Sequence, residues 1–280
     1  MSVNLTGRVA LVTGATRGIG RALTLAFAAA GAEVVGTARN AGPAPELAEE
    51  VKALGSTFTF VEADAGDWQD CGRVAATALE RHGRIDVLLN NAGTSLPQAR
   101  IDELEEQQWR DVAGPTLDGP LFMARAVLPA MRAQRDGVII NVASGAGVQG
   151  LATMGAYGLS KAAAIQLARV IAVENLEFGV RANALIVGAV ATELSLASLV
   201  ARGRDMFGPE WTPPVPTDGT SPMDAMMIPP ENLASAVLML SAPESREING
   251  AVIAIDRGFS AGSFNSALIG LAAGGLLSTG

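Results

Sequence analysis

A tyrosine and a lysine lie four positions apart in the sequence, at Tyr157 and Lys161. Residues at this spacing share one face of a helix, so the phenol and the ammonium group are predicted to be neighbours. A nearby ammonium group favours the phenolate, and we expect it to lower the pKa of Tyr157. Such a tyrosine can donate or accept a proton near neutral pH. Because Tyr157 is the only tyrosine of the chain, and Lys161 one of two lysines, a chance pairing is less expected than usual.

A serine, Ser144, follows closely on the apolar stretch Val138–Val142. This stretch is predicted to be a buried β-strand. Ser144 then lies at the carboxyl edge of the strand, where ligands and catalytic groups collect in open parallel sheets. We therefore take Ser144 as a candidate catalytic residue.

Three glycines follow the first predicted strand, Arg8–Thr13, and open a predicted helix. They are Gly14, Gly18 and Gly20. Glycines at these places permit a tight turn, a close approach of the backbone to a pyrophosphate, and close packing of the helix on the sheet. The free N–H groups at the start of the helix then face the phosphates. The position between strand and helix makes the motif informative, since glycines alone would be weak evidence.

The end of the second predicted strand indicates which dinucleotide is bound. A site that prefers NAD usually carries an acidic residue there, which holds the ribose 2′-hydroxyl. This chain has Ala38 followed by Arg39, and Arg17 stands inside the glycine loop. Two guanidinium groups suit a 2′-phosphate, so we predict NADP(H) as the cofactor. Alternatively, both arginines are solvated surface charges, because most of the basic residues of the chain are arginine.

Short apolar runs alternate with longer amphipathic segments along the whole chain. This alternation predicts an α/β protein with a doubly wound, Rossmann-like, mostly parallel seven-stranded sheet and helices on both faces. The predicted strands are Arg8–Thr13, Glu33–Thr37, Thr57–Val61, Ile85–Asn90, Val138–Val142, Val180–Leu185 and Ala251–Ile255. The predicted helices include Gly18–Ala30, Glu46–Leu54, Trp68–Arg81, Tyr157–Phe178 and Glu231–Leu240.

Composition excludes several classes of function. The 280 residues are 49% hydrophobic and carry a net charge of −8, which argues against a disordered chain and against binding to nucleic acid or an anionic membrane. One cysteine and one histidine leave little material for a metal site or a Ser-His-Asp triad. The N-terminus lacks the form of a signal peptide, and the apolar stretch Ala267–Leu277 is too short to cross a bilayer. We expect a cytoplasmic protein.

We expect residues 1–280 to form a single dinucleotide-binding and catalytic domain with two additions. Residues 193–230, here called the lid segment, are rich in proline, methionine and glycine, and are interpreted as an inserted substrate lid or as a plain surface excursion. Residues 262–280 form an uncharged apolar tail, either an interface or active-site segment or a frayed end.

Taken together, the motifs resemble those of the short-chain dehydrogenase/reductase family, in its single-domain form. The matching pieces are the glycine motif, Asn90-Asn91-Ala92-Gly93, Ser144 and the Tyr157–Lys161 pair, in that order. The resemblance runs from about residue 5 to residue 258, and several spaced motifs make it far more specific than any one of them.

The resemblance implies a role for each matching residue. Tyr157 would be the general acid for carbonyl reduction, Ser144 would bind the substrate oxygen, and Lys161 would bind the nicotinamide ribose. Thr116, the fourth catalytic candidate, stands where the family usually has an asparagine that completes a proton relay, between two prolines that predict altered helix geometry. The implied cofactor contacts are Gly14, Thr16, Arg17, Gly18, Ile19, Gly20, Arg39, Asp64, Ala65, Asn91, Tyr157, Lys161, Val190 and Thr192, and no metal is expected.

The function we predict is NADP(H)-dependent interconversion of a ketone or aldehyde and an alcohol. The apolar residues of the lid segment favour a mainly apolar small molecule; they include Leu194, Leu196, Leu199, Met206, Phe207, Trp211, Met223, Met226 and Met227. A homodimer or homotetramer is expected from the resemblance. Two alternatives stay open, a cofactor-binding protein with little turnover, suggested by Thr116, and non-redox chemistry on the same fold.

Overall fold

The protein is described here by a computed structural model, which covers residues 3–212 and 227–261. Within these residues the strands form one seven-stranded sheet in the order β3-β2-β1-β4-β5-β6-β7, and every neighbouring pair is parallel. The predicted doubly wound, Rossmann-like fold is confirmed. The strands are β1 (Val9–Thr13), β2 (Glu33–Ala38), β3 (Phe58–Glu62), β4 (Val87–Asn90), β5 (Gly137–Ser144), β6 (Val180–Val187) and β7 (Val252–Ile255).

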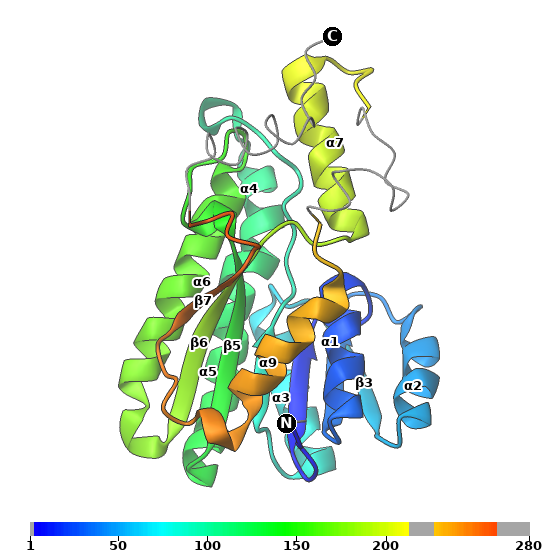
Figure 1. Ribbon diagram of the computed structural model, residues 1–280, viewed down its shortest axis with the longest axis vertical. Coiled ribbons are helices and arrows are strands. Elements are labelled where there is room, and N and C mark those ends of the chain that lie inside the picture. The colour runs from blue at the N-terminus through cyan, green and yellow to red at the C-terminus, as the bar shows by residue number, and fades with distance from the viewer. Residues whose placement is uncertain (1–2, 213–226, 262–280) are drawn as a thin grey trace.

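Helices connect the strands and cover the sheet (Figure 1). The α-helices are α1 (Gly18–Ala29), α2 (Ala44–Ala53), α3 (Trp68–His82), α4 (Glu106–Ala113), α5 (Gly119–Gln134), α6 (Gly155–Glu174), α7 (Glu193–Phe207) and α9 (Ala234–Ser241). Short helical turns add η1 (Ile101–Glu103), η2 (Gly114–Asp118), η3 (Gly145–Gly147), η4 (Leu176–Phe178), η5 (Pro230–Leu233) and η6 (Pro243–Ser245).

Each face of the sheet has its own hydrophobic core. On one face α1, α2 and α9 bury Phe27, Leu47 and Val237 against β1, β2 and β5. On the other face α3, α5 and α6 pack against the sheet through a second set of buried side chains, among them Val127 and Ile165. Burial on both sides explains why the central strands are apolar along their whole length.

Two predicted helices differ from the observed ones. The helix predicted over Tyr157–Phe178 begins at Gly155 and stops at Glu174, because the side chain of Asn175 bonds the carbonyl of Ile171 and interrupts the turn. The helix predicted over Glu231–Leu240 is divided into η5 and α9.

The lid segment begins with a regular helix. Helix α7 (Glu193–Phe207) is capped by the preceding Thr192, whose side-chain oxygen accepts a hydrogen bond from the backbone N–H of Ser195 at 3.2 Å. Residues 213–226 of the lid segment, with Met223 and Met226, and the tail at 262–280 lie outside the described residues. In the described ranges no helix is long and apolar enough to cross a membrane.

Candidate active site

A cleft of about 1110 Å³ opens at the carboxyl edge of the sheet. It spans the point where the strand order reverses, between β1 and β4, and parallel α/β sheets bind their ligands at such a point. The glycine loop, the end of β2, the loop after β4, the start of α6 and the start of α7 all contribute to its walls. The cleft therefore brings together residues from both halves of the chain.

The glycine loop has the shape that its residues predict. Gly14 and Gly18 have φ angles of +66° and +52°, in the left-handed region that favours glycine. A Cβ atom on Gly20 would lie 1.9 Å from the carbonyl oxygen of Gly14, so no side chain fits there. No side chains from these glycines cover the backbone of the loop where it leads into α1. A pyrophosphate can therefore approach the backbone N–H groups closely.

Arg17 and Arg39 both line the cleft, and both are exposed. Among the described residues neither guanidinium has an ion-pair partner within 4.0 Å, although Glu46 also lines this end of the site. Arg21, one helical turn further, differs, since Glu50 holds it at 2.5 and 2.7 Å. Two arginines without a carboxylate partner thus flank the place predicted for the 2′-phosphate.

Most of the other predicted cofactor residues also reach the cleft. Thr16, Ile19, Asp64, Ala65, Asn91 and Thr192 line it, whereas Gly20 and Val190 do not. Val190 is buried in the core, 2% exposed, and forms a bridge with Ile228. The amide of Asn91 donates to the carbonyl of Thr13 at 2.9 Å, so its first task is to tie the loop after β4 to the glycine loop.

Tyr157 lines the cleft with its side chain partly exposed, and Ser144 lies close enough to act as a hydrogen-bond partner of its hydroxyl. Burial raises the pKa of Tyr157, and the bond to Ser144 offsets part of that rise. The expectation that Lys161 lowers the pKa of Tyr157 is therefore wrong for this arrangement, because removal of the phenol from water dominates. A raised pKa keeps the phenol protonated near neutral pH, which suits a proton donor.

Lys161 lies beneath Tyr157, with its Nζ 5.6 Å from the centroid of the phenol ring. The ammonium group donates to the backbone carbonyl of Val142 at 2.6 Å. Burial lowers the pKa of Lys161 to about 8. The i to i+4 spacing thus places both groups on one helix face, as predicted.

Thr116 lies in the π-helical turn η2, which joins α4 to α5. The predicted disturbance of this helix is confirmed, since the two Gly-Pro pairs interrupt the regular α-helical hydrogen bonds. The side chain is fully buried, and its Oγ1 accepts a hydrogen bond from the N–H of Thr94 at 3.1 Å. A Cβ atom on Gly93 would lie 3.1 Å from that Oγ1 and 3.6 Å from the Nζ of Lys161. Gly93 therefore lies between Thr116 and the ammonium group of Lys161.

The segments that follow β4, β5 and β6 meet above the Tyr157 end of the site. Gln98 donates to the hydroxyl of Ser198 on α7 at 2.6 Å, and the N–H of Ala99 donates to the carbonyl of Thr153 at 3.0 Å. Arg202 on α7 contacts the sulfur of Met154 at 3.5 Å, and burial lowers the pKa of its guanidinium. Helix α7 is thereby joined to the loops beside the catalytic candidates.

Several of these partners were not predicted from the sequence. The carbonyl of Val142, the N–H of Thr94 and the amide of Gln98 are backbone or long-range partners that no spacing rule reveals. A signal did exist for Asn90, in the Asn90-Asn91-Ala92-Gly93 motif. Its amide bonds the side chain of Asn141 at 2.9 Å and thereby joins β4 to β5 beneath the site.

Comparisons with known proteins indicate the family of this chain. The profile of the short chain dehydrogenase family matches residues 8–199. A 3beta-hydroxysteroid dehydrogenase of Mediterraneibacter gnavus is 30% identical over 90% of this chain and 94% of its own length. A 3-oxoacyl-(acyl-carrier-protein) reductase of Thermotoga maritima is 31% identical over 91% of this chain and 99% of its own length. The crystal structure of levodione reductase superposes with a TM-score of 0.82 at 27% identity, covering 93% of this chain and all of that one.

The residues present fit a nicotinamide dinucleotide. The hydroxyl of Thr37 is buried at the wall of the cleft without a hydrogen-bond partner among the described residues, and the glycine loop leaves room for phosphates. The described ranges contain no cluster of side chains that could hold a metal ion. With the family profile covering most of the chain, this protein belongs to the short-chain dehydrogenase family, whose members are oxidoreductases that use NAD or NADP.

Proposed function

We propose that this protein is an NADP(H)-dependent oxidoreductase that interconverts a ketone or aldehyde and an alcohol. The observation that carries the proposal is the placement of Tyr157 beside Ser144, with Lys161 next to the phenol ring, in a cleft large enough for a dinucleotide. Arg17 and Arg39 support the choice of NADP(H), because they face the cleft without a carboxylate partner among the described residues.

In reduction, Ser144 and Tyr157 bind the carbonyl oxygen of the substrate through their hydroxyl groups. A nicotinamide cofactor, when bound in the cleft, would supply the hydride for the carbonyl carbon. Tyr157 transfers its phenolic proton to the oxygen, on which negative charge develops. Because burial raises the pKa of Tyr157, that proton is present at neutral pH.

Lys161 has two tasks in this proposal. Its ammonium group binds the ribose next to the nicotinamide, and its charge stabilises the phenolate that Tyr157 becomes. Thr116 is a positioning residue, since its hydroxyl holds Thr94 and fixes the backbone at Gly93 against Lys161. In the other direction Tyr157 accepts the proton of an alcohol.

We propose that the lid segment closes over a mainly apolar substrate. Leu194 and Ala197 line the cleft from α7, and the side chains of Ser198 and Arg202 join that helix to the loops beside Tyr157. The relatives named for a hydroxysteroid and for levodione support a small apolar carbonyl or alcohol. An acyl-carrier-protein substrate is less favoured, because the net charge of −8 repels an acidic partner.

The proposal is tested by following the absorbance of NADPH at neutral pH. A panel of aliphatic, cyclic and aryl ketones and aldehydes is offered, with NADH in parallel. We expect consumption that prefers NADPH for at least one apolar carbonyl. Tight NADPH binding without consumption by any member of the panel would favour the cofactor-binding alternative.

The pKa of Lys161 predicts a pH dependence. Below about pH 8 the lysine is charged, and above that value it is neutral because burial has lowered its pKa to about 8. We expect the kcat/KM for NADPH, which reports groups of the free enzyme, to fall as the pH rises through this value. In a Lys161→Arg variant the charge persists, and the decline should disappear. A flat wild-type profile between pH 6.5 and 9.5 would contradict this role.

Thr116→Val keeps the shape of the side chain and removes its hydroxyl. The N–H of Thr94 then loses its buried partner, at a cost of about 1–3 kcal/mol in unfolding free energy. We also expect kcat to fall about tenfold, since Gly93 is no longer held against Lys161. Thr116→Ser is the matched control and should retain most of the activity. A Thr116→Val variant with unchanged kcat would assign the hydroxyl to folding alone.

A homodimer or homotetramer is part of the proposal. Helix α6 supports it, because Leu159, Val170 and Val173 are 59%, 41% and 70% exposed on that helix. Native mass spectrometry would count the subunits, and a monomer at micromolar concentration would contradict the assembly.

A cytoplasmic location is supported by the free, buried Cys71, which suits a reducing compartment, and cell fractionation tests it.

A further inference from the structure

A second cavity, of about 440 Å³, lies at the opposite edge of the sheet from the active-site cleft. Its lining comes from Arg8 before β1, from the first residues of β5 and β6, and from the segment that joins α9 to β7. Because β6 runs for eight residues, the two sites are about 25 Å apart along that strand. The volume falls within the range of about 300–1,000 Å³ that is typical of small-molecule sites.

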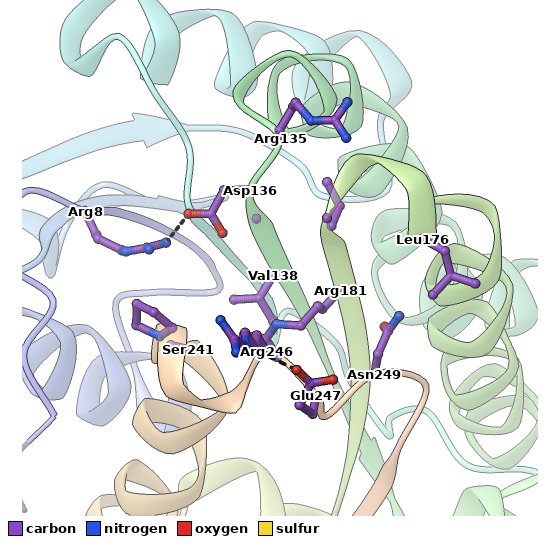
Figure 2. A pocket seen from close by; sticks show the side chains of 14 residues that line it. Arg8, Arg135, Asp136, Val138, Leu176, Arg181, Ser241, Arg246, Glu247 and Asn249 are labelled. Carbon is purple, nitrogen blue, oxygen red and sulfur yellow. Dashed lines mark hydrogen bonds and ion pairs between the residues drawn. The ribbon is translucent and has the colours of Figure 1, made fainter.

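The lining of this cavity is basic, although the protein is acidic. It contains Arg8, Arg135, Arg181 and Arg246 against the two carboxylates of Asp136 and Glu247, an excess of two positive charges. The whole chain, in contrast, has a net charge of −8. In Figure 2, Arg8 faces Asp136, Arg246 lies beside Glu247, and Arg135 extends away from the others.

Arg181 is the central residue of the cavity. Its guanidinium donates to the carbonyls of Ile248 at 3.0 Å, Leu240 at 2.7 Å and Ala242 at 3.5 Å. These bonds hold the C-terminal end of α9, which is a structural task, but they use only part of the five N–H donors of an arginine. Among the described residues no carboxylate lies within 4.0 Å of it; burial lowers the pKa of Arg181, and attraction to the more distant Asp136 offsets part of that effect.

The other arginines differ in how firmly they are held. Arg8 is bound to Asp136 at 2.8 Å and to the buried Asp86 at 3.4 Å, so both carboxylates are already engaged. Arg246 pairs only with its exposed neighbour Glu247 at 3.2 Å, and such surface pairs are weak. Arg246 is therefore available to turn toward a ligand beside Arg181.

We propose that this cavity binds a phosphate group, either as the free ion or as part of a small phosphorylated molecule. A phosphate carries a charge of about −1.5 to −2 at neutral pH, which matches the excess of positive charge among the residues that line the cavity. The planar guanidinium groups of Arg181 and Arg246 suit its oxygen atoms. The remaining volume accommodates an organic portion of a phosphorylated ligand. This site is separate from the one that Arg17 and Arg39 offer to a cofactor.

Calorimetric titration tests the proposal, with inorganic phosphate and with glycerol phosphate at constant ionic strength. The protein is first saturated with whichever nicotinamide cofactor it binds, so that phosphate cannot enter the cleft. We expect saturable binding to one site per chain. Tighter binding of glycerol phosphate would identify a phosphorylated molecule as the ligand, and equal binding would identify the free ion.

Arg246→Glu should weaken this binding by at least about tenfold, because it removes one charge-assisted contact and adds a repulsive carboxylate. Arg135→Ala should weaken it by only a few-fold, since Arg135 acts at longer range. Arg169→Glu on α6 is the matched control, an exposed arginine outside the cavity, and should leave the affinity unchanged. The absence of saturable binding would overturn the proposal. Equal affinity in Arg246→Glu would also overturn it.

Discussion

Replacement of Tyr157 by phenylalanine is expected to reduce carbonyl reduction by about 10²–10⁴-fold, the contribution of a positioned general acid. The phenol of Tyr157 lines the cleft beside Ser144, and its raised pKa keeps it protonated at neutral pH. Because Tyr157 is the only tyrosine of the chain, the change removes the sole phenol. The ring remains, and the cleft should keep its shape.

The loss should fall on kcat while the binding of NADPH, measured by fluorescence titration, stays within a few-fold of wild type. The melting temperature serves as the control for folding. Ser144→Ala should also reduce kcat, but less, since Tyr157 can still donate its proton. Turnover of Tyr157→Phe close to wild type would remove Tyr157 from the path of the proton.

Removal of both Arg17 and Arg39 should abolish the preference for NADPH. A charge-assisted hydrogen bond to a phosphate contributes about 1.5–3 kcal/mol, and exposure of both side chains reduces this. We expect the ratio of NADPH to NADH affinity to fall on the order of 10²-fold in the double alanine variant. Affinity for NADH should change little, because NADH has no 2′-phosphate.

Arg21→Ala is the matched control for this prediction. Arg21 also lines the cleft, but Glu50 binds its guanidinium at 2.5 and 2.7 Å. A ligand phosphate would have to compete with that carboxylate, so its removal should leave the cofactor ratio within a few-fold of wild type. An unchanged ratio in the Arg17→Ala, Arg39→Ala double variant would mean that both arginines are solvated surface charges.

The parts of the site that could be predicted from the sequence depend on short-range geometry. The glycine loop lies within one turn, and the Tyr157–Lys161 pair lies within one helix. Their arrangement in the structure is as predicted. The sheet could be predicted because burial on both faces leaves strands that are apolar throughout. The seven parallel strands agree with that prediction.

What could not be predicted depends on burial and on distant partners. The prediction that the pKa of Tyr157 is lowered was wrong. A four-residue spacing does not show how far other segments of the chain remove the phenol from water. Gln98 and Ser198 are bonded although they are 100 positions apart. The helix at the start of the lid segment was not predicted, because the proline and methionine content of residues 193–230 as a whole does not indicate a helix in its first part.

The basic cavity was missed for the same reason. Arg8, Arg181 and Arg246 are far apart in the chain, and only the parallel order of the strands brings them to one edge of the sheet.

Hydride transfer to a carbonyl carbon is the step that defines the proposed activity. The most direct measurement uses NADPH with deuterium at both C4 positions and a ketone that the panel has identified as a substrate. Mass spectrometry of the alcohol should find one deuterium, bound to the carbinol carbon, and the Tyr157→Phe variant should form almost none of this product. An alcohol without deuterium, or no alcohol from any carbonyl in the panel despite bound NADPH, would contradict the account.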